Sequence, residues 1–433
     1  MYKERIIFYY PLFIMSDSLT KLEKRTAYTL VLPAVVLVFA IVLFPIFANV
    51  WISFKDIELK DIRIPEPRAK KIVKSISENQ SELKIIYKLR NSSLIQEIRN
   101  VQFQDKFPTN VSPVNLDPRC NFQSKKVVCN FGNWQAKYRE NFEITIQNIN
   151  GEIIDKKIIK SQKPILSGKA DNPLLTTNFT LENFKKVFYE NNFVELLLTT
   201  FYFTFFGTVG AIIFGILAAQ LVNQNIQGRT YMRGILLFPY VGPVVALAYT
   251  WTLLLDPNSG TLNALLVNFN IIEQPINLLG QKYITMSILG FEFKLRLALT
   301  TVIFFEIWRY FPLAFLFILA RLQAIPQSLY EAAEVDGASP IQKFIHITLP
   351  QITAIISILF MIRFIWNFNK FEDIFLLTGG ASGTRTLPIN VYQQGFAVSD
   401  IGMGSAVSIV IVMLLLSFMV IYFRLIGKRA NEF

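Results

Sequence analysis

Six long apolar stretches alternate with polar segments along this chain of 433 residues. They cover residues 28–53, 193–222, 234–255, 297–319, 352–377 and 404–425. An α-helix rises about 1.5 Å per residue, so about 20 apolar residues cross a hydrocarbon core of about 30 Å. Lipid offers no hydrogen-bond partner to a free backbone amide, so each stretch is predicted to be a helix. The pattern predicts an α-helical polytopic membrane protein with six transmembrane helices.

Residues 54–180, between the first two stretches, follow a different pattern. Apolar and polar positions alternate over 83–89, apart from Ile86, and over 142–146, which is typical of half-buried strands. Further strands are predicted at 101–104, 125–130 and 153–159, with turns at 107–110, 131–133 and 150–151. Short strands separated by such turns predict an inserted all-β sandwich domain.

Basic residues mark one side of the predicted membrane region. They precede the first stretch, follow the last, and lie between stretches two and three and between four and five. Because Lys and Arg collect on the cytoplasmic side, both termini are predicted to be cytoplasmic, with 1–27 as a tail and 54–180 as an extracytoplasmic insert. The basic residues concerned are Lys21, Lys24, Arg25, Arg229, Arg233, Arg321, Lys343, Arg424, Lys428 and Arg429.

The N-terminal region is not predicted to contain a cleavable leader. The apolar run at 28–53 is longer than a signal core and lacks a clear small-residue cleavage site, so it is predicted to stay as an anchor. Residues 1–14 precede Met15 and are either a dispensable extension or the product of a misplaced start.

Composition supports the membrane interpretation. Hydrophobic residues make up 52% of the chain and charged residues 17%, whereas about 25% is usual for the charged residues of soluble domains. The net charge of +12 would suit nucleic-acid binding. The basic residues collect instead in membrane-flanking loops and in the insert, so the predicted surroundings are a lipid bilayer and not nucleic acid.

Both cysteines of the chain, Cys120 and Cys129, lie in the insert. The predicted topology places them outside the cytoplasm, where disulfides persist, and a bridge closing this short loop would contribute roughly 2–3 kcal/mol. Two buried free thiols are the alternative, and a metal site would need further ligands. Together with Gly132, Trp134 and the alternating strand that follows, the cysteine pair resembles the immunoglobulin-like repeat domains of bacterial surface proteins.

The most specific pattern lies at residues 326–350, between the fourth and fifth stretches. Ala332, Ala333 and Glu334 favour a helix, Gly337 permits a turn, and Pro340 is placed to start a second helix. The pattern predicts a helix–turn–helix that lies across the cytoplasmic membrane surface. Such an element, held by a span on either side, can pass motion from a soluble partner into the membrane.

This segment resembles the EAA loop of ATP-binding-cassette (ABC) importer permeases, which docks in a cleft of the ATPase subunit. The matching residues are Glu331, Ala332, Ala333, Asp336, Gly337, Ala338, Phe344, Leu349 and Pro350. The resemblance implies that Glu331 and Asp336 make polar contacts with an ATPase and that Gly337 forms the turn. It also implies the type I ABC importer permease fold, with a core at 181–433.

The resemblance extends over 28–53 and 192–429 and is closest to first-of-pair permeases of the maltose-type, carbohydrate-uptake family. It implies three partners: a second homologous permease, a cytoplasmic ATPase dimer and an extracytoplasmic substrate-binding protein. ATP and Mg would be bound by the ATPase, with no cofactor or metal on this chain. The implied location is a bacterial-type cytoplasmic (inner) membrane, and the implied substrate is a di- or oligosaccharide, or a related polyol or sugar phosphate. One departure is Ala-Ser-Gly at 381–383, where the family usually has Gly-Pro.

Polar and aromatic residues at membrane depth are the candidate substrate contacts, because burying polar groups there is costly and they tend to face an internal cavity. Trp366 and Asn367 resemble family positions near the sugar. The alternative for Arg309, Lys370 and Glu372 is anchoring at the outer membrane surface. The candidates are Trp308, Arg309, Tyr310, Trp366, Asn367, Asn369, Lys370 and Glu372.

Two other functions fit part of the pattern. A membrane-anchored interaction or adhesion protein would use the β-sandwich as its functional part, but it would have no need for the segment at 326–350. A membrane-embedded enzyme would need catalytic groups, and no His pair, Gly-x-Ser-x-Gly or carboxylate dyad is present; the Gly-rich run at 379–386 lacks the Gly-Lys pair of a phosphate loop. The chain is therefore predicted to be a transport subunit, with ATP hydrolysis on a separate chain.

Overall fold

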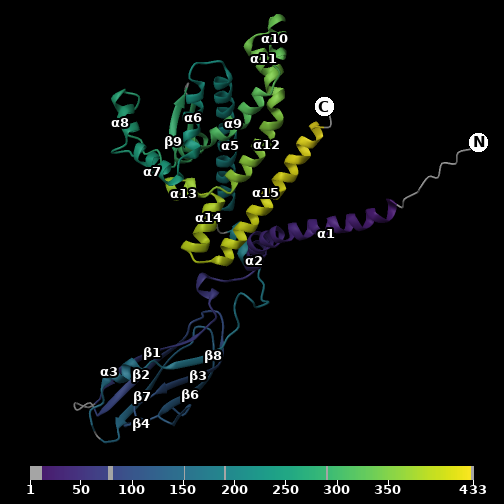
Figure 1. Ribbon diagram of the computed structural model, residues 1–433. Helices are drawn as coiled ribbons and strands as arrows, with labels where there is room; N and C mark the ends of the chain where they lie inside the picture. The colour runs from purple at the N-terminus through teal and green to yellow at the C-terminus, as the bar shows by residue number, and fades with distance from the viewer. Residues whose placement is uncertain (1–11, 77–80, 151, 190–191, 289–290, 431–433) are drawn as a thin grey trace, which may run out of the picture.

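The computed structural model describes residues 12–76, 81–150, 152–189, 192–288 and 291–430. A helical bundle forms one part of the molecule, and a β-rich insert extends from one end of it (Figure 1). The first helix, α1 (Leu12–Val38), reaches away from the bundle, and no residue in the most apolar part of this first span is buried. Of the residues that precede Met15, 1–11 lie outside the described residues.

Within the described residues, five helical segments are long and apolar enough to cross a membrane, and a bent helix pair makes a sixth where it is counted as one span. The spans are α1 with α2 (Phe44–Ser53), α5 (Phe193–Asn223), the pair α6 (Arg229–Val241) and α7 (Val244–Leu254), α9 (Leu297–Gln323), α11 (Pro340–Lys343) with α12 (Leu349–Phe368), and α15 (Ile401–Ala430). The prediction of a helical polytopic protein is confirmed.

The third predicted stretch, 234–255, is wrong as a single straight helix. The chain bends by 93° between α6 and α7, where Gly242 is extended at ψ 143°. Pro243 disfavours helical geometry at the residue before it and has no amide to donate, so the helix cannot continue through this point.

The fifth predicted stretch, 352–377, is also not one helix. The helix that begins at Pro340 ends at Phe368, and a separate helix, α13 (Glu372–Thr378), follows after a break at 369–371. The break carries Lys370, whose ammonium group pairs with Asp373 3.3 Å away.

Two of the spans contain a π-helical turn next to a proline. These turns, Phe39–Leu43 and Phe344–Thr348, lie just before Pro45 and Pro350. A proline ring clashes with the carbonyl four residues earlier and has no amide to bond it, and a wider turn relieves this conflict. The helix can therefore run on through the proline.

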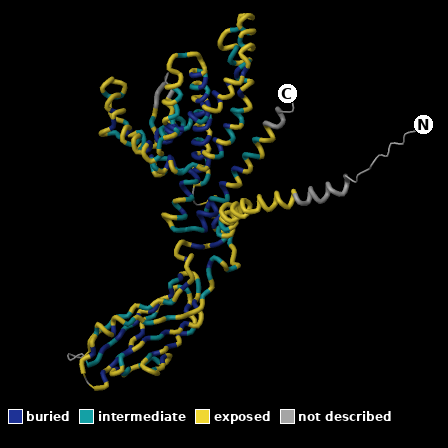
Figure 2. The backbone as a smooth tube through the Cα atoms, viewed as in Figure 1, coloured by how far each residue is buried: buried dark blue, intermediate teal, exposed yellow. Residues whose placement is uncertain are grey.

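The remaining short elements connect the spans. They are α4 (Glu182–Tyr189), α8 (Thr261–Asn268), α10 (Gln327–Val335), α14 (Leu387–Tyr392), a π turn at Gln393–Ala397, and the hairpin of β9 (Ile284–Ile288) and β10 (Phe291–Leu295). The centre of the bundle, where α5 packs on α9, is buried (Figure 2). A Cβ on Gly215 would lie only 2.6 Å from the Cβ of Ala314, so this glycine allows the two helices to approach closely.

The insert consists of two four-stranded antiparallel sheets. One sheet has the order β1 (Pro67–Ser75), β2 (Glu82–Asn91), β7 (Arg139–Asn148), β4 (Val111–Asn115); the other has the order β5 (Cys120–Gln123), β6 (Lys126–Trp134), β3 (Ile98–Lys106), β8 (Ile165–Lys169). Both sheets contribute side chains to one core, such as Ile85 from the first and Phe103 from the second. The strands predicted at 83–89, 101–104, 125–130 and 142–146 are confirmed.

Two local predictions in the insert are wrong. Residues 153–159 include the start of a helix, α3 (Lys156–Ser161), because the Asp155 carboxylate accepts a hydrogen bond from the Lys157 amide and caps it. The turn predicted at 131–133 lies inside β6, where Gly132 adopts φ +67° beside a register shift in the β3–β6 pairing. Of the turn predicted at 150–151, Gly151 lies outside the described residues.

The two cysteines of the insert are bonded. Cys120 and Cys129 face each other across the β5–β6 pair and form a disulfide. The bridge therefore joins neighbouring strands of one sheet and does not connect the two sheets.

Candidate functional site

The segment at 326–350 is built from two helices with a defined stop and start. Helix α10 ends in a Schellman motif: the Gly337 amide donates to the Glu334 carbonyl at 3.0 Å and the Ala338 amide donates to the Ala333 carbonyl at 2.9 Å. This motif needs a residue with positive φ, and Gly337 adopts φ +75°. The turn predicted at Gly337 is thus confirmed by its geometry.

The second helix begins with a capping box directly after the turn. The Ser339 hydroxyl accepts from the Gln342 amide at 3.3 Å, the Gln342 side chain accepts from the Ser339 amide at 2.7 Å, and Pro340 occupies the first helical turn. The helix then continues without a break to Phe368. The expectation that both helices lie across the membrane surface is therefore wrong for the second one, which is the start of the fifth span.

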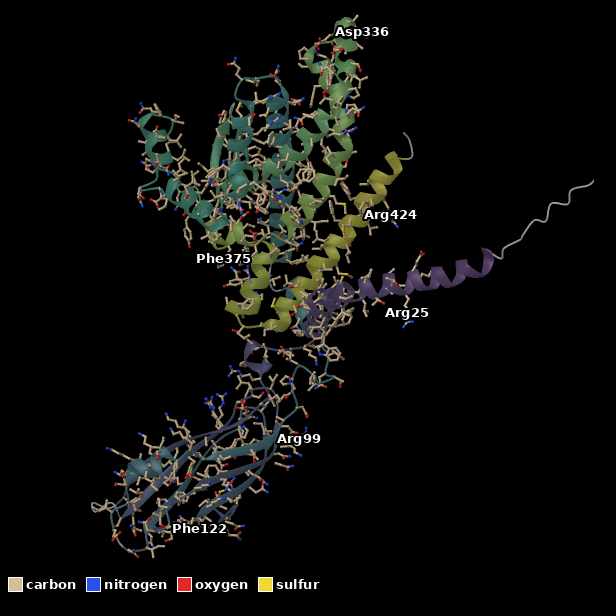
Figure 3. All side chains as sticks on the ribbon, in the orientation of Figure 1. Arg25, Arg99, Phe122, Asp336, Phe375 and Arg424 are labelled. Carbon is tan, nitrogen blue, oxygen red and sulfur yellow. A yellow bond between two sulfur atoms is a disulfide. The ribbon has the colours of Figure 1, made fainter. Side chains whose placement is uncertain are left out.

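The turn forms an exposed tip at the end of the bundle opposite the insert (Figures 1 and 3). Glu331 and Asp336 are exposed, and Val335 is 88% exposed. An ion pair of 2.7 Å between Glu334 and Lys343 ties the two helices together. The Tyr330 hydroxyl lies 2.9 Å from that of Thr348, and this contact fixes the base of α10.

The residues predicted to contact the ATPase lie around one small recess or next to it. A recess of about 330 Å³ opens between the two helices, lined by Ala333, Asp336, Gly337, Ala338 and residues of the second helix. Ala332 is exposed beside it, Phe344 is half-buried, and Pro350 is exposed one turn further into the span. The tip therefore presents carboxylates, a small recess and an apolar side chain on a braced support.

A second candidate site is a cluster of charges inside the bundle. The Arg363 guanidinium of α12 lies 2.6 Å from the Glu306 carboxylate of α9, and both side chains are almost fully buried, at 1% and 0% exposed. A charged pair in such surroundings is stable only when both partners are present. This pair was missed from the sequence, although single charges inside apolar stretches were the available signal.

Arg309, Lys370 and Asp373 extend this cluster toward α13. Arg309 lies 2.6 Å from Asp373 and Lys370 lies 3.3 Å from it. Lys370 also pairs with Glu372 at 3.2 Å and donates a hydrogen bond to the Tyr310 hydroxyl. The cluster contains equal numbers of basic and acidic side chains. The basic ones are Arg309, Arg363 and Lys370, and the acidic ones are Glu306, Glu372 and Asp373.

The Tyr310 ring is the common surface of the three cations. The charged groups of Arg309, Arg363 and Lys370 lie 4.9, 4.4 and 4.2 Å from its centroid. Cations at this distance are attracted by the electron-rich face of an aromatic ring. Four of the predicted contacts, including Glu372 at the rim, thus belong to one ion-paired cluster.

The other predicted contacts lie elsewhere. The Asn367 amide is buried and donates to the Thr208 hydroxyl on α5 at 3.2 Å. Trp308 packs on Trp251, with ring centroids 5.4 Å apart, in the apolar core. Trp366 is 51% exposed on the surface of α12, and the Asn369 side chain bonds back to its own helix at 3.1 Å. The candidates therefore do not form a single site in this chain alone.

The insert has its own buried ion pair. Lys71 on β1 lies 2.6 Å from Asp105 on β3, so the pair joins the two sheets, and the Tyr87 hydroxyl donates to the same carboxylate. Burial lowers the pKa of Lys71 and raises that of Tyr87. Near the disulfide, hydrogen bonds from Arg119 hold the pKa of Asp117 down to about 2.

Comparison with known proteins identifies the transmembrane part. A family model for the "Binding-protein-dependent transport system inner membrane component" matches residues 211–431. The chain belongs to this family. The permease is a transport subunit and not an enzyme, and the match begins beyond the insert. In the described part of the permease, no group of three or more His, Cys, Asp or Glu side chains is arranged to hold a metal ion.

Several named permeases are similar over the same part of the chain. The permease is 30% identical over 262 residues to the inner membrane ABC transporter permease protein YcjO of Escherichia coli K12, covering 60% of this chain and 84% of the relative. It is 32% identical over 253 residues to the trehalose/maltose transport system permease protein MalF of Thermococcus litoralis, covering 58% and 80%. It is 31% identical over 255 residues to the sn-glycerol-3-phosphate permease UgpA of E. coli strain UTI89, covering 58% and 81%.

A solved structure shares the fold. A chain of a bacterial ABC transporter that imports the acidic polysaccharide alginate superposes with a TM-score of 0.52 at 21% identity, covering 59% of the permease and 85% of that chain. The permease is therefore a multi-pass inner-membrane component with the helical fold of ABC importers.

Proposed function

We propose that this permease forms the sugar pathway of an ABC importer together with a second, homologous permease. The observation that carries the proposal is the tip at 326–350, where a Schellman motif and a capping box present Glu331 and Asp336 on a braced support. A cytoplasmic ATPase dimer would receive this tip in a cleft. ATP and Mg would be bound by that ATPase.

The placement of the insert supports the proposed topology. The tip and the insert lie at opposite ends of the helical bundle (Figure 1). With the tip in the cytoplasm, 54–180 is extracytoplasmic, and the tail at 1–27 and the C-terminus are cytoplasmic. We assign 28–53 to the first span and 181–433 to the permease core. We propose an immunoglobulin-like sandwich for the insert: its two four-stranded sheets are compatible with this, whereas its disulfide joins neighbouring strands of one sheet.

The substrate class follows from the relatives. Their names include trehalose/maltose and sn-glycerol-3-phosphate transport, so we propose a di- or oligosaccharide, or a related polyol or sugar phosphate. Trp366 and Asn369 are exposed on or next to α12, and in this proposal they contact the second permease. Arg309, Tyr310, Lys370 and Glu372 form the polar part of the pathway, and Trp308 and Asn367 support it from inside the bundle.

Charge reversal at the tip tests the coupling role. Glu331→Lys should leave the protein inserted in the membrane but abolish ATP hydrolysis stimulated by substrate and binding protein. Gln323→Lys, at the exposed end of α9, adds a positive charge near the tip without changing it and serves as control. Stimulated hydrolysis and transport by Glu331→Lys at the level of the control would reject the proposal.

The insert is proposed to recruit or orient the extracytoplasmic binding protein. Replacing 55–180 by a short linker should preserve membrane insertion and basal ATP hydrolysis while weakening stimulation by the binding protein. The attraction should also weaken with salt, since the insert is basic. Unchanged affinity for the binding protein across a range of salt would show that the insert has another role.

A further inference from the structure

Three arginines form a row across the membrane-proximal end of the first sheet of the insert. Arg68 on β1 faces Arg90 on β2, and Arg90 faces Arg139 on β7. Residues in register on neighbouring strands point to the same face, about 5 Å apart, and all three side chains are exposed. We call this row the arginine ladder.

The ladder is electrostatically unfavourable by itself. Like charges directly opposite each other destabilise a sheet. In the described part of the insert, ion pairs form elsewhere, such as Arg119 with Asp117 and Glu140, and none includes a ladder arginine. The next row on the same face adds Lys70 opposite Lys88. An anionic ligand on this face would offset the repulsion.

The ladder lines a cleft between the insert and the helical bundle. The cleft has a volume of about 830 Å³, and its wall includes Val398 and Ser399 of the loop before α15. Arg63 and Lys137 contribute further positive charge to the wall. Three acidic residues also line the cleft: Glu58, which is paired with Lys60 at 2.5 Å, Asp61, whose carboxylate accepts from the Glu58 amide at 3.1 Å, and Glu66, which is exposed.

The position of the cleft indicates the surroundings of the ligand. The wall segment that starts at Glu58 follows the end of the first span at Ser53 by five residues, and the Val398–Ser399 wall immediately precedes the last span. Both walls therefore lie at the level of the lipid headgroups on the side of the insert. Ile62 and Ile64, beside the basic wall, are 42% and 53% exposed, a mixture typical of a membrane interface.

A separate apolar recess lies at the outer end of the first span. It has a volume of about 500 Å³ and is lined by Phe47, Val50, Trp51, Phe54 and Phe179 at the outer end of the first span. Phe54 and Glu58 are four residues apart, so the recess and the cleft are separated by at most about 14 Å of chain. Trp51 donates its indole N–H to the Leu174 carbonyl at 2.6 Å, as is common for a tryptophan at the interface.

We propose that the cleft and the recess together bind an anionic phospholipid, with the phosphate on the arginine ladder and an acyl chain in the recess. The lipid would brace the neck of the insert against the bundle. A free anion would satisfy the ladder but would have no use for the recess.

The test uses the importer complex in nanodiscs that contain equal amounts of phosphatidylglycerol and phosphatidylcholine with the same acyl chains. Native mass spectrometry should show preferential retention of phosphatidylglycerol. The variant Arg68→Gln/Arg90→Gln/Arg139→Gln should lose this preference by on the order of a hundredfold, since each basic side chain at an anionic surface contributes about fivefold. The matched control, Lys106→Gln/Lys125→Gln/Lys169→Gln, removes the same charge from exposed positions on and beside the other sheet and should keep the preference.

Four results would overturn the proposal, the last of them an effect on stability. The first is equal retention of the two lipids by the wild type, or equal loss in the ladder variant and the control. The second is displacement of the lipid by glycerophosphoglycerol, the headgroup without chains, as effectively as by phosphatidylglycerol, which would identify a free-anion site. The third is unchanged lipid retention in the ladder variant with weakened binding of the substrate-binding protein, which would identify a protein contact. The ladder variant should keep the unfolding temperature of the insert, because it removes repulsion; a lower temperature would show that the arginines are structural.

Discussion

Gly337 is the residue whose replacement tests the tip most directly. Its φ of +75° is required by the two hydrogen bonds that close the Schellman motif, and a Cβ built on it meets no atom within 4 Å. Any effect of a small substitution must therefore come from the backbone and not from a clash. Substitutions at Gly337 therefore test whether coupling depends on the conformation of the turn, separately from the surface that the turn presents.

Three substitutions at Gly337 should raise the free energy of the turn conformation by increasing amounts. Gly337→Asn should be nearly neutral, because asparagine tolerates the left-handed region. Gly337→Ala should cost about 1–2 kcal/mol. Gly337→Pro fixes φ near −65° and removes the amide that bonds Glu334, at a cost of about 3 kcal/mol, which favours a rearranged turn by roughly a hundredfold.

The assay is ATP hydrolysis stimulated by substrate and binding protein, with transport measured in the same proteoliposomes. Stimulation should fall in the order Gly, Asn, Ala, Pro, while membrane insertion stays constant because the tip lies outside the bilayer. Full stimulation of the Pro variant would show that the turn geometry is not needed for coupling. An Asn variant as inactive as the Pro variant would show that the site requires a bare backbone for contact and not for its conformation.

Further predictions concern the insert and the buried charges. Cys120 and Cys129 should resist alkylation in protein taken from the native envelope until reductant is added, and replacing both by Ala should lower the stability of the insert by roughly 2–3 kcal/mol; free alkylation without reductant would reject the bridge. Arg363→Met should destabilise the bundle by about 3–5 kcal/mol in thermal unfolding, because it leaves Glu306 charged and unpaired; an unchanged unfolding temperature would show that Glu306 does not depend on its partner. Because the folded pKa of Asp117 is depressed from 3.8 to about 2, its contribution to stability is complete above 3.8 and lost as pH falls toward 2. Hydrogen exchange around β5–β7 in the full-length protein should follow this loss, and an Arg119→Met variant should lose protection at a higher pH; identical profiles would contradict the assignment.

The apolar lengths predict the spans well because lipid leaves the backbone few choices. The predicted helices and strands are wrong where a local residue, such as a proline or a helix-capping side chain, ends or starts an element inside an apolar stretch. The Gly242-Pro243 pair is visible in the sequence, yet the surrounding apolar residues favour one long helix over a bent pair. In the insert, Ile153 and Ile154 precede a helix that is set by the side chain of Asp155, and so short an apolar run does not distinguish strand from helix.

Of the two candidate sites, one can be predicted from the sequence and the other cannot. The tip is predictable because its turn and caps are local: Gly337, Ser339 and Gln342 lie within six residues. The buried cluster is not, because its partners come from distant segments. Glu306 and Arg363 are 57 residues apart in the chain. The sequence around either residue does not predict which residue it pairs with. Only packing of α9 against α12 brings them together.

The continuous helix from Pro340 to Phe368 connects these two sites mechanically. Its first turn forms half of the tip, and Arg363, near its other end, is paired with Glu306 on α9. Where this helix moves as one body, movement of the tip shifts Arg363 against α9. A buried ion pair is often no more stable than an apolar replacement, which favours a role in fixing the register of the two helices. The double variant Glu306→Gln/Arg363→Met should therefore recover much of the stability lost in Arg363→Met but not the coupling of ATP hydrolysis to transport. Recovery of both would show that the pair contributes to stability alone.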